Sequence, residues 1–311
     1  MVNPMPRLDG RSWILLAILA LLWSASFIFI KVGAAEIPIL TLVLLRVGLA
    51  ALVLNGLVIL SRRSYPARPA TLASYLVMGI LNNVVPFVLI VYATAHLGAG
   101  AASILNATAP IFTLLVAHVA TRDEKITAAK LTGILFGFMG VAAMANPGAV
   151  TGLAGELVAV AAMLGATFCY GLSAVYGRRF SGIDPIVSAT CQLSASTLIL
   201  LPLALIADKP FALPMPGLIA IGAVLGLALL ATALAYVIFY ALIARAGGTN
   251  TMLVTLLIPV GGVFFGWLLL GESFTAAEAA GMTLIGLGLI VIDGRAFARL
   301  RGRAQVGAAG G

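Results

Sequence analysis

Charged side chains are scarce in this sequence: 18 Lys and Arg with 10 Asp and Glu make up only 9% of its 311 residues. A soluble domain carries about 25% charged residues. Apolar residues (Ala, Val, Ile, Leu, Met, Phe, Trp, Tyr and Cys) make up 62% of the chain, against the roughly 45–50% that is usual. This composition excludes a soluble globular protein. Since a bilayer-spanning helix takes about 20 apolar residues, it allows on the order of ten spans.

The residue types that supply most enzyme chemistry are also few, with two Cys and two His. Cys169 and Cys191 lie in apolar runs, which is typical of core residues rather than of a disulfide or a metal site. His96 and His118 lie far apart along the chain, and the motifs GxSxG, HExxH and CxxC do not occur. We therefore expect neither an enzyme nor a bound metal or cofactor.

Apolar runs separated by charge, Pro or Gly predict an all-α membrane protein with ten transmembrane helices. The predicted spans are residues 12–33, 38–60, 72–94, 101–120, 130–146, 153–177, 184–206, 216–243, 249–270 and 276–294. Within the first span, Ser24-Ala25-Ser26 resembles a signal-peptidase site, but the apolar run continues through Ile30, which favours an uncleaved helix.

The basic residues predict how these spans are oriented. When the loops are assigned alternately to two sides, one side collects 15 of the 18 Lys and Arg: Arg7, Arg11, Arg62, Arg63, Arg68, Arg122, Lys125, Lys130, Arg178, Arg179, Arg245, Arg295, Arg299, Arg301 and Arg303. The positive-inside rule then places both termini in the cytoplasm, with residues 295–311 as a basic tail of an inner-membrane protein. No nucleic-acid-binding motif accompanies this charge, so we expect no nucleic-acid partner.

The second half of the sequence repeats the first. At an offset of 148 residues the chain matches itself in the pairs Tyr92 and Tyr240, Gly100 and Gly248, Glu124 and Glu272, Thr127 and Thr275, Gly133 and Gly281, and Gly140 and Gly288. The earlier part of each half matches at an offset of 147, in the pairs Ser26 and Ser173, and Pro38 and Pro185. The sequence therefore predicts two copies of one unit, residues 12–146 and 153–294.

Each copy holds five predicted spans, and an odd number makes the second copy enter the bilayer in the opposite sense. Inverted repeats recur in secondary transporters, because two such halves can open a site at the midplane to either side in turn. The repeat therefore favours a transporter, and a gene duplication without mechanistic meaning is the alternative.

The same residues carry a resemblance to a known family. The stretch from Tyr92 to Met144 has small residues after the Tyr, then Pro110, Glu124 and a Gly-rich last span, and the stretch from Tyr240 to Ile292 matches it. Trp23-Ser24, Pro38 and Arg46 fit as well. Over about residues 12–294 the chain resembles the EamA repeat of the drug/metabolite transporter (DMT) superfamily.

This resemblance implies a ten-helix exporter of amino acids or other metabolites, similar to the aromatic amino acid exporters. It also implies a central cavity lined by the first, third, fourth, sixth, eighth and ninth spans. Two positions depart from the repeat: Lys125 becomes Ser273, and Arg46 has no basic counterpart near Gln192 and Leu193. Any role of Arg46 therefore belongs to one half only.

Polar groups kept inside the membrane are the candidates for substrate contact. Arg46 lies well inside the second span, where a guanidinium can bind a substrate carboxylate through two hydrogen bonds. A structural Arg satisfied by helix-end carbonyls or by Glu36 is an equal alternative. The amides considered are Asn82, Asn83, Asn106 and Asn250, which lie near prolines. We expect hinges at Pro110 and Pro259, since proline removes a helical hydrogen bond. For the amides, hydrogen bonds between helices are the alternative.

Aromatic side chains complete the predicted site. They are Trp23, Phe87, Tyr92, Phe168, Tyr170, Tyr236 and Tyr240. Each one alone is more often a packing residue, but together they favour a substrate with an apolar or aromatic body.

The scarcity of charge limits the substrate. Phosphorylated sugars or nucleotide sugars would call for several basic groups, whereas the spans offer Arg46 and, at a span end, Lys31. We therefore expect export of small neutral or zwitterionic metabolites, foremost apolar or aromatic amino acids, by alternating access. A multidrug or other metabolite efflux transporter, a channel and an intramembrane enzyme are the alternatives. Small-xxx-small patterns such as Gly133/Gly137 fit either a monomer or a weak homodimer.

Overall fold

The computed structural model describes residues 9–120, 128–144, 153–246, 251, 254–271, 273 and 275–293, and every regular element within these ranges is a helix. This confirms the all-α fold class. The predicted loops at 121–127 and 145–152, together with Asn250 and the tail 295–311, lie outside the described residues.

The helices follow the predicted spans closely. In the first half they are α1 (Gly10–Gly33), α2 (Ile39–Leu60), α3 (Pro69–Gly79), α4 (Val85–Leu97), α5 (Ala99–Asn106), α6 (Ala109–Ala120) and α7 (Ala128–Met144). In the second half they are α8 (Leu153–Tyr176), α9 (Pro185–Ala207), α10 (Leu218–Leu225), α11 (Ala235–Ala246), α13 (Val254–Leu270) and α14 (Ala276–Asp293). Two π-helical segments join helices end to end: η1 (Ile80–Val84) between α3 and α4, and η4 (Gly226–Leu234) between α10 and α11.

Seven helical stretches in the described part of the chain are long and apolar enough to cross a bilayer. They are Gly10–Gly33, Ile39–Leu60, Pro69–Leu97, Ala99–Ala120, Glu156–Phe180, Pro185–Ala207 and Leu218–Leu242. Three shorter apolar helices, Leu131–Gly140, Leu257–Leu270 and Ala276–Gly288, lie where the fifth, ninth and tenth spans are predicted.

The outward faces of the helices are as apolar as their packed faces. In α2, Leu52 is exposed and Leu42 is fully buried, and in α9, Ile206 is exposed and Leu200 is fully buried. Trp267 of α13 is also exposed. A soluble protein rarely exposes a large contiguous apolar surface, because water would hydrate it at a cost. This distribution fits a protein whose outer surface contacts lipid.

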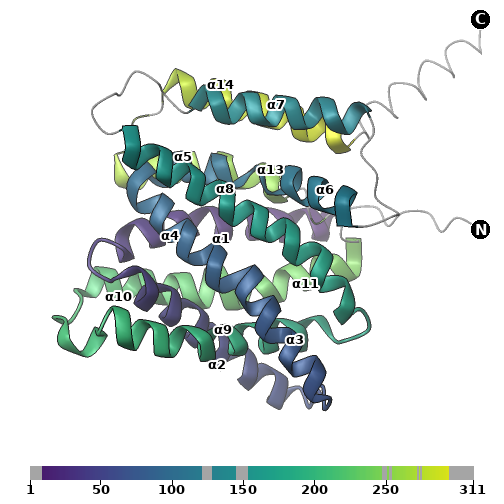
Figure 1. The fold of residues 1–311 in the computed structure, drawn as a ribbon, viewed down its shortest axis with the longest axis vertical. Coiled ribbons are helices and arrows are strands. Elements are labelled where there is room, and N and C mark those ends of the chain that lie inside the picture. Colours follow the sequence, from purple (N-terminus) through teal and green to yellow (C-terminus); the bar gives the residue numbers. More distant parts are fainter. Residues whose placement is uncertain are drawn as a thin grey trace, which may run out of the picture.

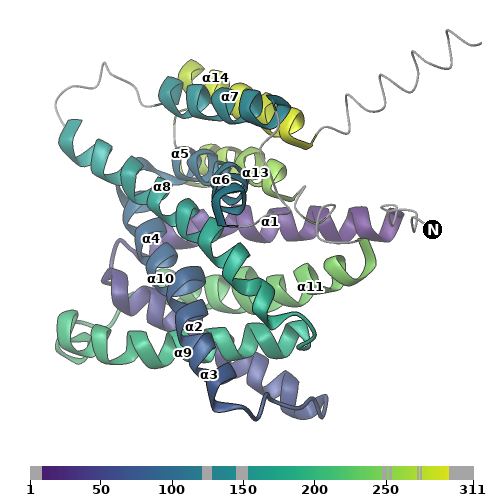
Figure 2. The ribbon, with the colours of Figure 1, turned by 45° about the vertical axis from the view of Figure 1, so that its right-hand side comes forward.

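The helices stack in layers, which Figures 1 and 2 show from two directions. At one end α7 and α14 lie side by side, next come α5, α6 and α13, and at the other end α2 packs against α9 beside α3. Helices α1, α4, α8 and α11 fill the middle, where α4 packs on α8 and α1 packs on α11. The largest cluster of buried residues runs through the middle layers and also includes residues of α2 and α9.

Glycines set the close approach of α7 and α14. A Cβ atom at Gly140 would lie 2.7 Å from the carbonyl oxygen of Gly281, and one at Gly288 would lie 2.5 Å from that of Gly133. Neither distance is compatible with a real side chain, so the two backbones meet only because these positions lack one. The two contacts correspond to each other, since Gly133 matches Gly281 and Gly140 matches Gly288 in the sequence repeat.

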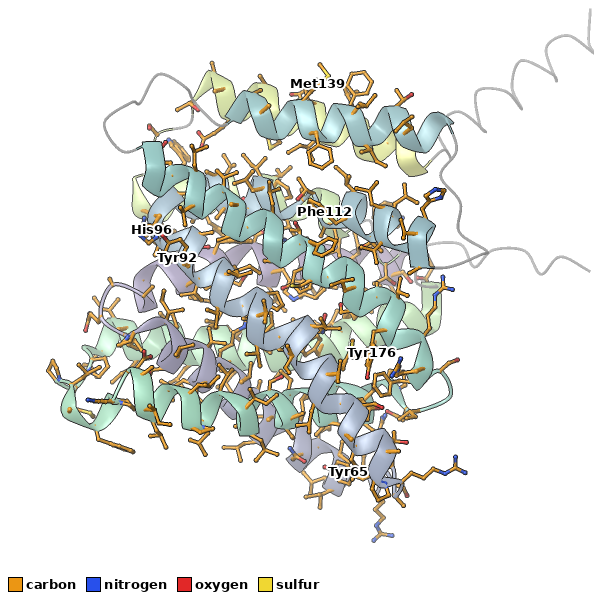
Figure 3. The ribbon with its side chains drawn as sticks, in the orientation of Figure 1. Tyr65, Tyr92, His96, Phe112, Met139 and Tyr176 are labelled. Carbon is orange, nitrogen blue, oxygen red and sulfur yellow. The ribbon has the colours of Figure 1, made fainter. Side chains whose placement is uncertain are left out.

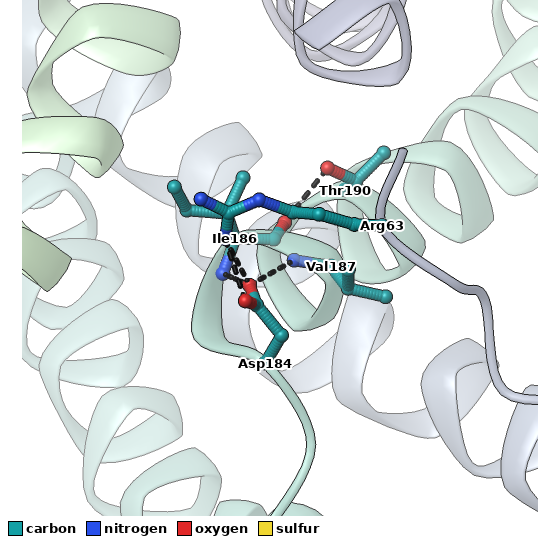
Figure 4. A network of polar contacts seen from close by, with 5 residues as sticks. All are labelled: Arg63, Asp184, Ile186, Val187 and Thr190. Atoms are coloured by element: carbon teal, nitrogen blue, oxygen red, sulfur yellow. Dashed lines mark hydrogen bonds and ion pairs between the residues drawn. The ribbon is translucent and has the colours of Figure 1, made fainter. Parts of the chain in front are cut away.

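Helices α2 and α9 are antiparallel and are tied together at both ends. At one end Arg63, just after α2, donates from Nη1 to both carboxylate oxygens of Asp184, at 2.7 and 2.6 Å. Figure 4 shows that Asp184 also accepts the backbone N–H groups of Ile186 and Val187, and so caps the start of α9. At the other end Asp208, after α9, accepts the backbone N–H and the hydroxyl of Thr41 in α2.

Candidate functional site

A buried cation lies where α2 meets the π-helical segment η4. Arg46 of α2 is only 6% exposed. Its Nε donates to the hydroxyl oxygen of Thr232 in η4 at 3.0 Å, and its guanidinium carbon lies 3.6 Å from the centroid of the Phe87 ring. Cation–π attraction of this kind strengthens when water is excluded.

The partners of Arg46 among the described residues are neutral, and Arg46 is the only charged residue among those that are buried. The alternative partner Glu36 is wrong, because its carboxylate accepts the backbone N–H of Gly217 at 2.6 Å instead. An unpaired charge in a low-dielectric interior is costly. A buried Arg held by neutral groups therefore marks a candidate site rather than a structural ion pair.

A network of neutral hydrogen bonds joins three helical elements, η1, α8 and α9. Asn82 of η1 donates to the Gln192 side-chain carbonyl in α9 at 3.3 Å and accepts the Ser173 hydroxyl of α8 at 3.0 Å. Asn83, fully buried next to it, donates to the Ser196 hydroxyl of α9 at 3.0 Å. Both predicted amides thus lie in one polar cluster, whose other members come from the second half of the chain.

Tyr236 connects this cluster to the cation and to a row of aromatic rings. Its hydroxyl donates to the Asn83 side-chain carbonyl at 3.3 Å, and Tyr236 and Tyr170 both lie within electrostatic range of Arg46. Its ring stacks on Tyr240 with centroids 6.2 Å apart. The row continues through Phe239, which contacts Tyr240 and, at 5.4 Å, the ring of Trp23 in α1.

The two π-helical segments occupy matching positions of the sequence repeat. An offset of 148 places η1, Ile80–Val84, onto residues 228–232, inside η4. In η1 the cause is local, since Pro86 cannot donate a helical hydrogen bond. Segment η4 has no proline, and its wider turns leave the carbonyl of Leu227 to accept the Thr232 hydroxyl, five residues on, at 2.8 Å. π-Helical turns often lie at functional sites, and here each presents polar groups to the α2 or α9 helix of the other half.

Among the described residues, no hydrogen bond or ring contact joins three other predicted site residues to this cluster. The ring of Tyr92 contacts that of His96 within α4 in a tilted arrangement, with ring centroids 4.2 Å apart, and both residues are labelled in Figure 3. Phe168 is 44% exposed and meets the ring of Phe112 edge-on. Asn106 ends α5, and its side-chain oxygen is sealed from solvent without a partner among the described residues.

The two predicted hinge prolines occupy different helical positions. Pro110 is the second residue of α6, just after the break at Ala107–Thr108, a position where its missing N–H costs nothing. Pro259 lies inside α13, where it removes a helical hydrogen bond. Beside Pro259, the Ser24 hydroxyl of α1 donates to the carbonyl of Ile258 at 2.9 Å. Pro110 therefore follows a break between two helices, whereas Pro259 weakens the interior of one helix.

Sequence reasoning missed Thr232, Ser173, Gln192 and Ser196 as members of the site. Gln192 carries a usable signal, because a primary amide inside an apolar span is rare and costly. Threonine and serine give none, since a hydroxyl inside a helix can bond to its own backbone, as the Ser196 hydroxyl does to the Gln192 carbonyl. Among the described residues, no group of three or more His, Cys, Asp or Glu is placed to hold a metal ion.

Similar proteins in several organisms are named as transporters or efflux pumps. A protein of Archaeoglobus fulgidus named an uncharacterized transporter is 26% identical over 91% of this chain and 98% of its own length. An S-adenosylmethionine/S-adenosylhomocysteine transporter of Chlamydia trachomatis serovar L2 is 29% identical over 87% and 86% of the two chains. A probable amino-acid metabolite efflux pump of Salmonella typhimurium is 27% identical over 92% and 95%.

The fold and the family are also shared with known proteins. A solved crystal structure superposes with a TM-score of 0.65 over 91% of this chain and 96% of its own, at 19% sequence identity. The sequence profile of the EamA-like transporter family matches the chain twice, at residues 11–146 and 157–293. These two matches cover nearly all of both halves and confirm the resemblance to EamA proteins. The chain belongs to the EamA-like transporter family.

Proposed function

We propose that this protein exports small neutral or zwitterionic metabolites across the cytoplasmic membrane, and that amino acids with apolar or aromatic side chains are its foremost substrates. The observation that carries the proposal is the buried, uncompensated charge of Arg46 beside neutral amides, hydroxyls and aromatic rings. A single buried cation favours a substrate with one negative group, and the Tyr236–Tyr240–Phe239–Trp23 row favours an apolar body.

The substrate site in this proposal has a core and a periphery. Its core consists of Arg46, Asn82, Asn83, Phe87, Tyr170 and Tyr236, and Trp23 and Tyr240 extend it. Tyr92, Asn106, Phe168 and Asn250 remain candidates of lower rank, since no described contact joins them to Arg46.

We also propose that transport proceeds by alternating access of two inverted five-helix halves. Helix contacts support this, because they stay the same when each helix is exchanged for its counterpart in the other half. Helix α8 packs on α4 and α6, and correspondingly α1 packs on α11 and α13. The pairs α2 with α9, and α7 with α14, map onto themselves under the same exchange. Asp184 joins α2 and α9 at one end of the pair, and Asp208 joins them at the other end. In this proposal the two contacts open alternately during transport.

The names of two relatives support the substrate class. The Salmonella typhimurium relative is named an amino-acid metabolite efflux pump, and the Chlamydia trachomatis relative is named a transporter of S-adenosylmethionine and S-adenosylhomocysteine. A multidrug efflux protein is the second candidate within the same class, favoured by the apolar character of the aromatic row.

Purified protein in liposomes tests the proposal. Liposomes loaded in turn with each of the common amino acids, with and without a pH gradient, should show saturable efflux for an apolar or aromatic amino acid. If no amino acid shows saturable efflux but bulky apolar drugs do, the substrates are drugs rather than amino acids. Non-saturating current would instead favour a channel, and chemical conversion of the solute would favour an enzyme.

A further inference from the structure

The guanidinium of Arg46 has one side left to bind a ligand. Its Nε atom is occupied by the Thr232 hydroxyl oxygen, and one face of the group is covered by the ring of Phe87. Within the described residues, its two Nη atoms have no hydrogen-bond acceptor and no carboxylate partner. The free side is therefore the edge that carries both Nη atoms.

This Nη edge is not sealed inside packed protein. Two described side-chain atoms are both sealed from solvent and unpartnered, Thr94 Oγ1 and Asn106 Oδ1. The Nη atoms of Arg46 lack partners but are not among the sealed atoms, so the small accessible remnant of this buried residue includes them. An edge with parallel N–H donors matches the two oxygens of a carboxylate.

We propose that the Nη edge of Arg46 binds the carboxylate of the transported substrate, and that Thr232 is the positioning residue that aims this edge. The inference rests on the proposed function and deepens it, since it assigns the atoms that hold the substrate carboxylate and the residue that positions them. A guanidinium fixed at Nε and on one face can present only its remaining edge.

Thr232 is suited to this role by its own hydrogen bonds. Its hydroxyl proton is donated to the carbonyl of Leu227 at 2.8 Å, which turns an oxygen lone pair toward Arg46 Nε at 3.0 Å. The π-helical turn of η4 supplies that carbonyl five residues earlier. Serine can reproduce both bonds, whereas valine, of the same shape, can make neither.

The test compares a carboxylate with its amide. Calorimetry on the full-length protein in detergent measures binding of L-phenylalanine and of L-phenylalaninamide, and liposome efflux measures KM and maximal rate for L-phenylalanine. The wild type should bind the acid at least about tenfold more tightly than the amide, because the amide forfeits the charge-assisted bonds. Arg46→Gln should abolish this preference while amide binding changes little.

Variants of Thr232 separate positioning from folding. Thr232→Val should raise the KM for L-phenylalanine several-fold with little change in maximal rate, as loss of ground-state binding does, and Thr232→Ser should restore it. Arg179→Gln is the matched control, since Arg179 also stacks on an aromatic ring, Tyr176, but lies exposed at a helix end. The ratio of its binding affinities for L-phenylalanine and L-phenylalaninamide should equal that of the wild type.

Two failures are distinguishable. If the wild type transports L-phenylalanine but Arg46→Gln keeps the acid-to-amide ratio, or Thr232→Val keeps the KM, the carboxylate assignment is wrong and the transporter proposal stands. If the wild type shows neither binding of either probe nor saturable flux of any amino acid, both proposals fail.

Discussion

At the scale of single residues, the buried polar groups meet mostly neutral partners, and charged pairs lie at the helix ends. Arg46 rests on Thr232 and Phe87, whereas Arg63 and Asp184 form an ion pair with both side chains more than a third exposed. This division follows from solvation, because a charge that reaches water at the membrane surface keeps most of its hydration energy.

The end of α9 gives a prediction at this scale. Partial burial acts to raise the pKa of Asp184, but the hydrogen bonds from Arg63, Val187 and Ile186 outweigh it and lower the pKa below its usual value. Asp184→Ala removes the cap and should cost about 1 kcal/mol of stability at neutral pH. Asp184→Asn keeps an acceptor and removes the charge, so it should cost less, because exposed ion pairs are weak.

The pH dependence of this effect has a definite sign. A carboxylate with a lowered pKa in the folded state stabilises the protein above the unfolded pKa of about 3.9, and this contribution is lost as the pH falls through the folded pKa. Thermal unfolding in detergent should therefore show a wild-type advantage over Asp184→Asn at pH 7 that shrinks below about pH 4. An advantage that is constant down to pH 3 would contradict the assignment.

Individual residues also show where sequence reasoning stops. The candidates Arg46, Asn82, Asn83, Phe87 and Tyr236 come together because costly polar groups and their neighbours are visible in an apolar span. Phe168 is predicted for the same site, and in the structure its ring is 44% exposed and contacts the ring of Phe112 edge-on. Helix rotation about its own axis depends on packing, and the weak amphipathicity of membrane helices leaves it unspecified.

At the scale of elements, hydropathy predicts helix positions well and helix irregularities poorly. The ends of α1, α2 and α9 follow the predicted apolar runs closely. The sequence of η4 gives no sign of its π-helical form, because Gly226–Leu234 lacks proline and has the pattern of an ordinary apolar helix. In the folded chain this segment packs against α1 and α2, and hydropathy does not show these contacts.

Pro259 gives a prediction for the elements that move. Pro259→Ala restores a donor inside α13 and should stiffen it, so the maximal transport rate should fall while thermal stability is kept or raised. Pro110→Ala should change the rate less, since Pro110 occupies the second position of α6, where no helical bond is missing. Equal effects of the two substitutions on liposome efflux would contradict a hinge inside α13.

Glycines of the α7 and α14 pair give a second prediction. Gly140→Ala places a methyl group 2.7 Å from the carbonyl oxygen of Gly281 and should destabilise the protein by about 1–3 kcal/mol, as overpacking does. Gly286→Ala in α14 meets nothing within 4 Å and should be neutral or slightly stabilising. Thermal unfolding of both variants in detergent checks this contrast, which a destabilised Gly286→Ala would overturn.

At the scale of the whole molecule, charge bias predicts the orientation in the membrane. We expect Ser64, in the loop with Arg62 and Arg63, to face the cytoplasm, and Ala212, after Lys209, to face the opposite side. Both positions are exposed. In a background with Cys169 and Cys191 replaced by serine, a membrane-impermeant maleimide should label Ala212→Cys in intact cells and Ser64→Cys only in inside-out vesicles. The reverse pattern would invert the topology.

If two halves alternate around the Arg46 site, as we propose, the protein must carry out counterflow, in which one substrate molecule is exchanged for another. Liposomes preloaded with unlabelled L-phenylalanine and diluted into labelled L-phenylalanine should accumulate label transiently above equilibrium, because a carrier exchanges one substrate for another. Arg46→Gln should abolish the overshoot, and Arg179→Gln should retain it. Uptake by the wild type that never exceeds equilibrium and does not saturate would contradict alternating access.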